Sequence, residues 1–190
     1  MDELLGIIWD HLVSGVNAGE KRSAFTMMQV ATIGLNGLPG VRTVVMRRAD
    51  RENSLLAFHT DLRSEKVREI EKEPHVGIVV GDWPAGIQIR LDGLARVVED
   101  RNERLVIWNS SRPRTLTLYR VPLVPGTAIE TPEDARPSSP TPGPLEGFEN
   151  FCVVDVHIQK IDFLDVSGKT HRRAQFSLER GQWQATWVAP

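Results

Sequence analysis

The sequence is poor in the residues that mark the more specialised classes of protein. It has one cysteine, Cys152, so no disulfide can form within the chain, and we expect a reducing, cytoplasmic location. Its net charge is only −2, which disfavours a dedicated nucleic-acid binder. Aromatic residues make up 6%, leaving few platforms on which bases could stack. No apolar run reaches the length of a membrane span, so we expect no membrane partner.

Signatures of metal binding and nucleophilic catalysis are also missing. The sequence has no C-x-x-C or H-x-x-x-H pair, and His59, His75 and His157 lie in strand-like runs, which favours structural histidines. Cys152 stands in the apolar run FCVVDV and is interpreted as a small core residue. We therefore predict no metal site, and we assign no residue as an obligatory acid or base.

What is present is an ordinary globular composition with a clear change of periodicity. The 190 residues, 41% of them hydrophobic, are enough for one sizeable domain, which we place at 1–190. Residues 2–14 carry apolar side chains at three- and four-residue spacing, which predicts an amphipathic helix that Gly15 can end. From residue 25 the period is two, and Asn36-Gly37 between two alternating runs predicts a hairpin.

Strand signals dominate the remainder of the chain. We predict strands at residues 54–60, 75–82 and 87–98 and in several runs after 151. Short helices are expected from Ser64 to about Pro74, and after Asp100, which has capping-box spacing to Glu103. Residues 130–147 hold five prolines and are predicted to form a loop or extended arm. The fold class is therefore mainly β, antiparallel, with peripheral helices, and a closed barrel would avoid long exposed edges.

Three polar features are candidates for binding one anion. Arg42 and Arg47 flank the apolar centre of the run RTVVMRR, and a guanidinium group suits phosphate. On a regular strand the two arginines lie on opposite faces, so they share a ligand only across the strand's edge or end. Ser64 and Lys66 stand at a predicted helix start, where backbone N–H groups favour phosphate. Gln88 and Arg90 lie on the polar face of the strand predicted at 87–98.

In this order and spacing, the segments RTVVMR, FHT, RSEK and WPAGIQIRLDG resemble the motifs of the FMN-binding split barrels related to pyridoxamine 5′-phosphate oxidase. The resemblance runs from about residue 25 to the C-terminus and is strongest over 41–98. It implies an antiparallel split barrel, FMN as the cofactor, a small-molecule substrate and a homodimer.

The resemblance also assigns individual residues. The implied cofactor contacts are Arg42, Thr43, Val44, Val45, Arg47, His59, Thr60, Ser64, Lys66, Gln88 and Arg173. Among them Ser64 and Lys66 would bind the phosphate, and Gln88 would reach across from the second subunit. The implied substrate contacts are Arg47, Trp108, Arg112 and His171, of which His171 lies in the segment THRRAQF.

The sequence departs from the oxidase pattern mainly on the substrate side. Trp108 replaces a tyrosine and Leu116 replaces a serine, although the literal match SRPR keeps Arg112. On the cofactor side, Glu65 stands in place of an arginine and Leu164 in place of a flavin-stacking tryptophan. We therefore expect a largely complete cofactor site and an altered substrate site.

Three functions remain open on the sequence. The leading one is an oxidoreductase that transfers a hydride from an unidentified small molecule to FMN. The second is a non-catalytic FMN-binding carrier or sensor, and the third, least favoured, is a nucleic-acid-binding barrel. The motifs do not separate FMN from another flavin or a deazaflavin, because the phosphate and ring contacts are similar.

Overall fold

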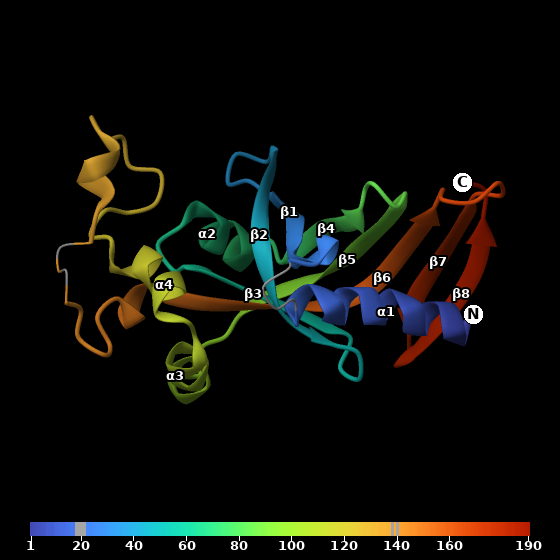
Figure 1. Ribbon diagram of the computed structural model, residues 1–190, viewed down its shortest axis with the longest axis horizontal. Helices are drawn as coiled ribbons and strands as arrows, with labels where there is room; N and C mark the ends of the chain where they lie inside the picture. Colours follow the sequence, from blue (N-terminus) through green and yellow to red (C-terminus); the bar gives the residue numbers. More distant parts are fainter. Residues whose placement is uncertain (18–21, 138, 140) are drawn as a thin grey trace.

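The computed structural model describes residues 1–17, 22–137, 139 and 141–190, and in these the chain is mainly β (Figure 1). The strands are β1 (Met27–Ile33), β2 (Pro39–Asp50), β3 (Leu55–Asp61), β4 (His75–Asp82), β5 (Ile87–Val97), β6 (Phe151–Asp165), β7 (Arg172–Glu179) and β8 (Gln182–Val188). The α-helices are α1 (Asp2–Val16), α2 (Glu65–Lys72), α3 (Arg101–Ser110) and α4 (Pro113–Leu116). No helix of the described residues combines the length and the apolar character that crossing a membrane requires.

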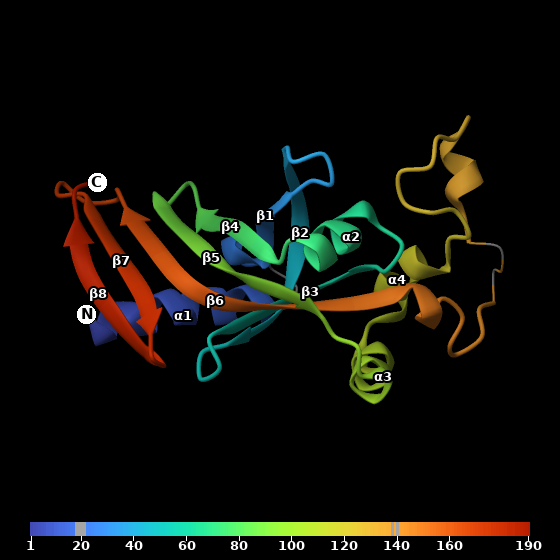
Figure 2. The ribbon, with the colours of Figure 1, turned by 180° about the vertical axis from the view of Figure 1, so that it is seen from behind.

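The strands form one antiparallel sheet in the order β3-β2-β1-β4-β5-β6-β7-β8, and a further pairing of β3 with β6 closes the first six into a barrel. The long strand β6 makes this possible, because residues 151–157 pair with β3 while residues 160–165 pair with β7. Strand β6 therefore runs from the barrel to the β7–β8 hairpin (Figure 2). The predicted closed, mainly β barrel with few helices is confirmed.

Two apolar clusters fill the interior. The larger one lies inside the barrel and under α1, and the fully buried side chains of Trp9, Phe58 and Phe176 belong to it. The smaller one joins Trp108, Tyr119, Phe148 and Phe151 next to the start of β6. Cys152 is fully buried, and burial raises the pKa of its thiol to about 12, which confirms its interpretation as a core residue.

The structure corrects some predicted details. Helix α1 continues through Gly15 to Val16, so Gly15 is not its end. This glycine lies against the main chain of Phe25, where a Cβ atom would come within 2.4 Å of the carbonyl oxygen. The glycine is therefore a packing residue. In the predicted proline-rich segment, Pro132–Ala135 forms a 3-10 turn, while residues 138 and 140 lie outside the described residues.

Substitution of Gly15 by Ala tests this packing. Helix propensity alone would make the change stabilising by about 1 kcal/mol. The contact with the Phe25 carbonyl reverses the sign, and we expect the free energy of unfolding to fall by ~1–3 kcal/mol in urea titrations. The matched control is Gly6→Ala in the same helix, where the new Cβ would lie an ordinary 3.4 Å from Arg51 Nη1. A Gly15→Ala protein as stable as the Gly6→Ala protein would contradict the packing role.

Candidate functional site

The site begins where strands β2 and β3 separate. They pair only through Met46–Asp50 and Leu55–Phe58. Before Met46, β2 continues on β1 alone, whereas after Phe58, β3 continues on β6. The β2 edge at residues 42–45 and the end of β3 therefore form the two sides of a wedge. A cleft of about 770 Å³ opens here, a volume typical of sites for small molecules and cofactors.

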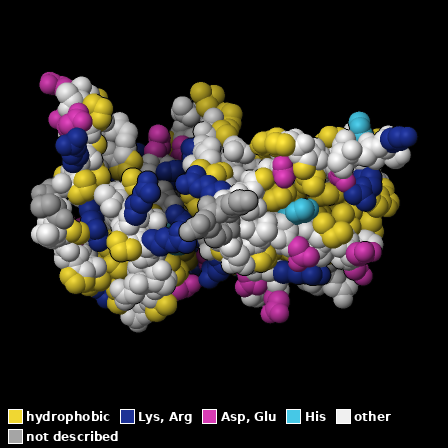
Figure 3. All heavy atoms as spheres, in the orientation of Figure 1, with side chains coloured by type: hydrophobic (Ala, Val, Ile, Leu, Met, Phe, Trp, Pro, Cys, Tyr) yellow, Lys and Arg dark blue, Asp and Glu magenta, His cyan; other side chains and the backbone are white. Residues whose placement is uncertain are grey.

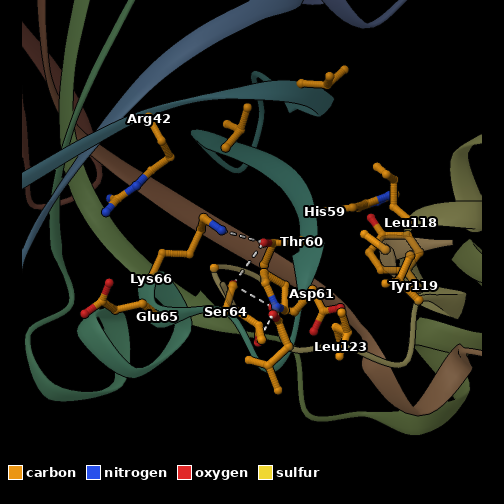
Figure 4. Close-up of a pocket in the computed structure, with 18 of the residues that line it drawn as sticks. Arg42, His59, Thr60, Asp61, Ser64, Glu65, Lys66, Leu118, Tyr119 and Leu123 are labelled. Carbon is orange, nitrogen blue, oxygen red and sulfur yellow. Dashed lines mark hydrogen bonds between the residues drawn. The ribbon is translucent and has the colours of Figure 1, made fainter. Parts of the chain in front are cut away.

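A group of polar side chains lies at the start of α2, on the β3 side of the wedge (Figure 4). Lys66 Nζ donates to Thr60 Oγ1 at 3.1 Å, and the hydroxyl oxygens of Thr60 and Ser64 lie 3.3 Å apart. Ser64 occupies the predicted N-cap position, but its hydroxyl donates back to the Asp61 carbonyl at 2.6 Å. Because the hydroxyl does not cap the helix, the first N–H groups of α2 are left for another acceptor.

Several positively charged side chains gather in the cleft. Arg42, Arg47 and Lys66 all line it, and Lys and Arg side chains gather over this hollow in Figure 3. Burial is the main cause that lowers the pKa of Lys66, and the nearby Arg42 lowers it further. Burial is also the main cause that lowers the pKa of Arg47. The nearby Tyr119 raises this pKa, and Arg112 lowers it. A bound anion would compensate for the lost hydration of these cations and offset their mutual repulsion.

Arg42 and Arg47, near the two ends of the run RTVVMRR, both line this cleft. On a regular strand they would point to opposite faces, but the β2–β3 register shifts between Met46 and Arg48. This irregularity is a β-bulge at Arg47, a feature that re-aims side chains. Both arginines line the cleft, together with Thr43, and the cleft runs along the edge of β2.

His59 lines the cleft and has one buried ring nitrogen, Nδ1, without a hydrogen-bond partner among the described residues. Its ring meets Phe151 edge-on with centroids 5.0 Å apart. Burial lowers the pKa of His59 to about 4, with Arg47 and Arg48 acting in the same direction. The imidazole is therefore neutral near pH 7 and can accept or donate one hydrogen bond to a ligand.

The second wall of the cleft comes from an arm formed by residues 113–137, which projects beyond the barrel in Figure 1. Arg63 fastens the arm to the end of β3. Its guanidinium forms a bidentate pair with Asp61 and donates to the carbonyls of Val121 and Pro122 at 2.9 and 3.0 Å.

The arm's contribution to the cleft is mostly apolar and was missed in the sequence. Its lining side chains include Leu118, Leu123, Val124, Pro125 and Ile129. The available signal was the apolar run TLTLYRVPLVPG, which is too hydrophobic for an ordinary surface loop. This wall gives the cleft an apolar face opposite its cations.

Two of the predicted substrate contacts stand outside the cleft next to the arm. Trp108 is 1% exposed and its indole N–H donates to the Pro144 carbonyl at 2.9 Å, so this side chain is a core residue. Because it is buried, Trp108 cannot make the predicted contact with a substrate in the cleft. Arg112 is exposed at the start of α4, close enough to Arg47 to lower its pKa. Of the predicted substrate residues, only Arg47 lines the cleft.

Three further predicted residues form a separate group. Gln88 on β5, Leu164 on β6 and Arg173 on β7 are register partners across three neighbouring strands, and exposed His171 immediately precedes β7. Arg173 is held by Asp162, with Nη2 and Oδ2 2.8 Å apart. This end of the sheet lies away from the arm in Figure 1, so Gln88, Arg173 and His171 do not line the cleft of their own chain.

The residues of the cleft fit FMN. The group at Lys66, Ser64 and Thr60 suits a phosphate, and the apolar arm suits a planar ring. Within the described part of the chain, no group of three or more His, Cys, Asp or Glu side chains is arranged to hold a metal ion.

Comparison with known proteins agrees with this fit. Residues 7–99 match the family model described as "Pyridoxamine 5′-phosphate oxidase, FMN-binding domain". Pyridoxine/pyridoxamine 5′-phosphate oxidase 2 of Arabidopsis thaliana is 28% identical over 192 residues, which cover 95% of this chain and 94% of that protein.

Solved structures show the same fold at lower sequence identity. A pyridoxamine 5′-phosphate oxidase-related, FMN-binding protein from Nostoc punctiforme superposes with a TM-score of 0.80 at 24% identity, covering 97% of this chain and 96% of the other. PhzG from Burkholderia lata gives a TM-score of 0.73 at 16% identity, with coverage of 97% and 91%. Residues 7–99 therefore match the FMN-binding domain of the pyridoxamine 5′-phosphate oxidase family, the cofactor is FMN, and the whole chain shares the fold of related solved structures.

Proposed function

We propose that the protein is an FMN-dependent oxidoreductase acting on a small molecule that carries an anionic group. The observation that supports this most is the wedge between β2 and β3, which joins the polar group of Lys66, Thr60 and Ser64 to further cations and an apolar wall. When bound, FMN supplies the acceptor for a hydride or for electrons.

In this proposal the chain's own residues bind and orient. Lys66, Ser64, Thr60 and Arg42 hold the cofactor phosphate together with the first N–H groups of α2. The edge of β2 at residues 42–45 offers main-chain groups along the length of the cofactor. The apolar arm would shield a bound flavin ring from water. No side chain is required as an acid or base, so positioning and electrostatics are the protein's contribution.

Arg47 is our proposed contact for the substrate's anionic group. Tyr119 and Arg112 are the nearby groups that shift the pKa of Arg47. Arg42 and Asp61 are among those that shift the pKa of Lys66. The cleft therefore offers two separate cationic positions, one more than a cofactor phosphate needs. This second position favours an enzyme over a carrier or sensor. The distinguishing measurement is bleaching of the flavin absorbance by a candidate substrate under anaerobic conditions, which a carrier would not show.

Replacing Lys66 tests the cofactor site. Lys66→Ala removes a charge-assisted contact, so we expect the dissociation constant for FMN to rise by roughly 10- to 150-fold, equivalent to ~1.5–3 kcal/mol. Riboflavin, which has no phosphate, should bind both proteins alike in fluorescence titrations. The control is Arg68→Ala, an exposed cation on the same helix, which should leave both affinities unchanged. Equal FMN affinity of the Lys66→Ala and wild-type proteins would place the phosphate elsewhere.

We further propose that pyridoxamine 5′-phosphate is a poor substrate. Leu116 is buried and offers no hydrogen bond, and the N–H of Trp108 is already bound to Pro144. Losing two bonds to a charged phosphate costs ~3–6 kcal/mol, or roughly 10²- to 10⁴-fold in affinity. We expect little oxygen uptake or pyridoxal 5′-phosphate formation by the FMN-loaded protein. Turnover on the order of 1 s⁻¹ at micromolar substrate would contradict this expectation.

A homodimer with shared sites is the third proposal. Gln88 and Arg173 match flavin contacts of the family yet lie outside the cleft of their own chain, so a two-fold partner would supply them. Lys66→Ala and Gln88→Ala homodimers should each bind FMN weakly. After unfolding and refolding together, mixed dimers should regain one intact site, about a quarter of all sites. No recovery in the mixture, or a monomer that binds FMN stoichiometrically by light scattering, would contradict shared sites.

A further inference from the structure

Glu69 is a buried carboxylate directly behind the cofactor cleft. It lies on α2 and is only 4% exposed. Its Oε2 atom accepts hydrogen bonds from Thr32 Oγ1 at 2.6 Å and from Arg42 Nη2 at 2.9 Å. Thr32, on β1, is 2% exposed and its hydroxyl oxygen in turn accepts a hydrogen bond from Arg42 Nη1. The three side chains form a closed triangle that joins β1, β2 and α2.

A buried carboxylate at this position should disfavour anion binding, so its presence calls for a functional explanation. A negative charge behind an anion site repels the ligand, and a buried ion pair is weak evidence of added stability, because desolvation offsets its attraction. Arg42 belongs to both environments, since it completes the triangle and also lines the cleft. Its side chain is 24% exposed. A guanidinium has five N–H donors, so two nitrogens can be held from behind while other N–H groups face the cleft.

We propose that Glu69 is a positioning residue that, with Thr32, fixes the Arg42 guanidinium in the orientation that binds the FMN phosphate. The inference rests on the proposed phosphate site at Lys66 and Arg42. Fixing the side chain before the ligand arrives removes the cost of ordering a long, flexible arginine during binding. Glu69 acts only through Arg42 and does not touch the cofactor.

Gly40 leaves the room that this arrangement needs. A Cβ atom at Gly40 would lie 2.5 Å from Arg42 Nη2 and 3.5 Å from Glu69 Oε1. Gly40→Ala would therefore displace the guanidinium without removing any polar group. It offers a second perturbation of Arg42 that is independent of charge.

The substitution Glu69→Gln tests the proposal, because positioning and its alternatives predict opposite changes in FMN affinity. It keeps the shape and an acceptor for Thr32 but removes the charge that holds Arg42. If Glu69 only repelled the phosphate or supported the fold, the variant would bind FMN as well as the wild type or more tightly. Positioning predicts the opposite, an FMN dissociation constant about tenfold higher, with riboflavin affinity changed far less. Gly40→Ala should weaken FMN binding in the same selective way.

A double-mutant cycle with Arg42→Gln shows whether the effect passes through the arginine. We expect Glu69→Gln to add nothing to the loss of FMN affinity once Arg42 is replaced. Glu71→Gln is the matched control, an exposed glutamate on the same helix that should change neither affinity. Thermal unfolding of each apo-protein identifies the folded variants, and a Glu69→Gln protein that is unfolded is replaced by Gly40→Ala in the comparison.

The outcomes separate this inference from the proposed function. Selective weakening of FMN binding by Glu69→Gln or Gly40→Ala, absent when Arg42 is already replaced, supports positioning. Folded Glu69→Gln and Gly40→Ala proteins with wild-type or tighter FMN binding overturn it while leaving the phosphate site intact. An undiminished effect of Glu69→Gln after Arg42 is replaced also overturns it. A wild-type protein that binds neither flavin contradicts the proposed function and the inference together.

Discussion

The pairing of β3 with the first half of β6 is the contact on which the rest of the structure depends. It closes the barrel, and it also draws the end of β3 away from β2, since His59, Thr60 and Asp61 find their partners on β6. The wedge that becomes the cleft is a direct consequence of that divergence. The strand pairing that closes the barrel therefore also opens the cleft.

The charges around the wedge follow a consistent pattern. Arg63 is neutralised by Asp61 and is used to fasten the arm. Arg48 is neutralised by Asp155 and lies outside the cleft lining. By contrast, Lys66 and Arg47 line the cleft and form no ion pair among the described residues, and burial is the main cause that lowers their pKa values. Arg42 stands between these two groups, because it pairs with Glu69 and also lines the cleft.

The sequence predicted the elements well because the barrel is built from local signals. Alternation placed β5, Asn36-Gly37 placed the hairpin, and Asp100 capped α3 as expected. The linear pattern could not reveal the bulge at Arg47, which depends on how β2 meets β3. Nor could it show that Gly15 packs on Phe25, a contact between separate elements.

The candidate site was predictable only in part, for the same reason. The positions from Arg42 to Lys66 follow from local motifs, and the structure brings them together in one cleft. The burial of Trp108 depends on the second core cluster, and the wall formed by the arm depends on Arg63 reaching Val121, neither of which is a local signal. The role proposed for the β5–β7 group around Gln88 depends on a second copy of the chain, which no local pattern describes.

A crystal structure of the protein grown with FMN would show whether the cofactor phosphate binds in the wedge between β2 and β3. We expect phosphate oxygens within hydrogen-bonding distance of Lys66 Nζ and the Ser64 hydroxyl, with the ring extending along the β2 edge toward His59. A phosphate bound instead at Arg47, or a flavin bound outside this cleft, would contradict this expectation.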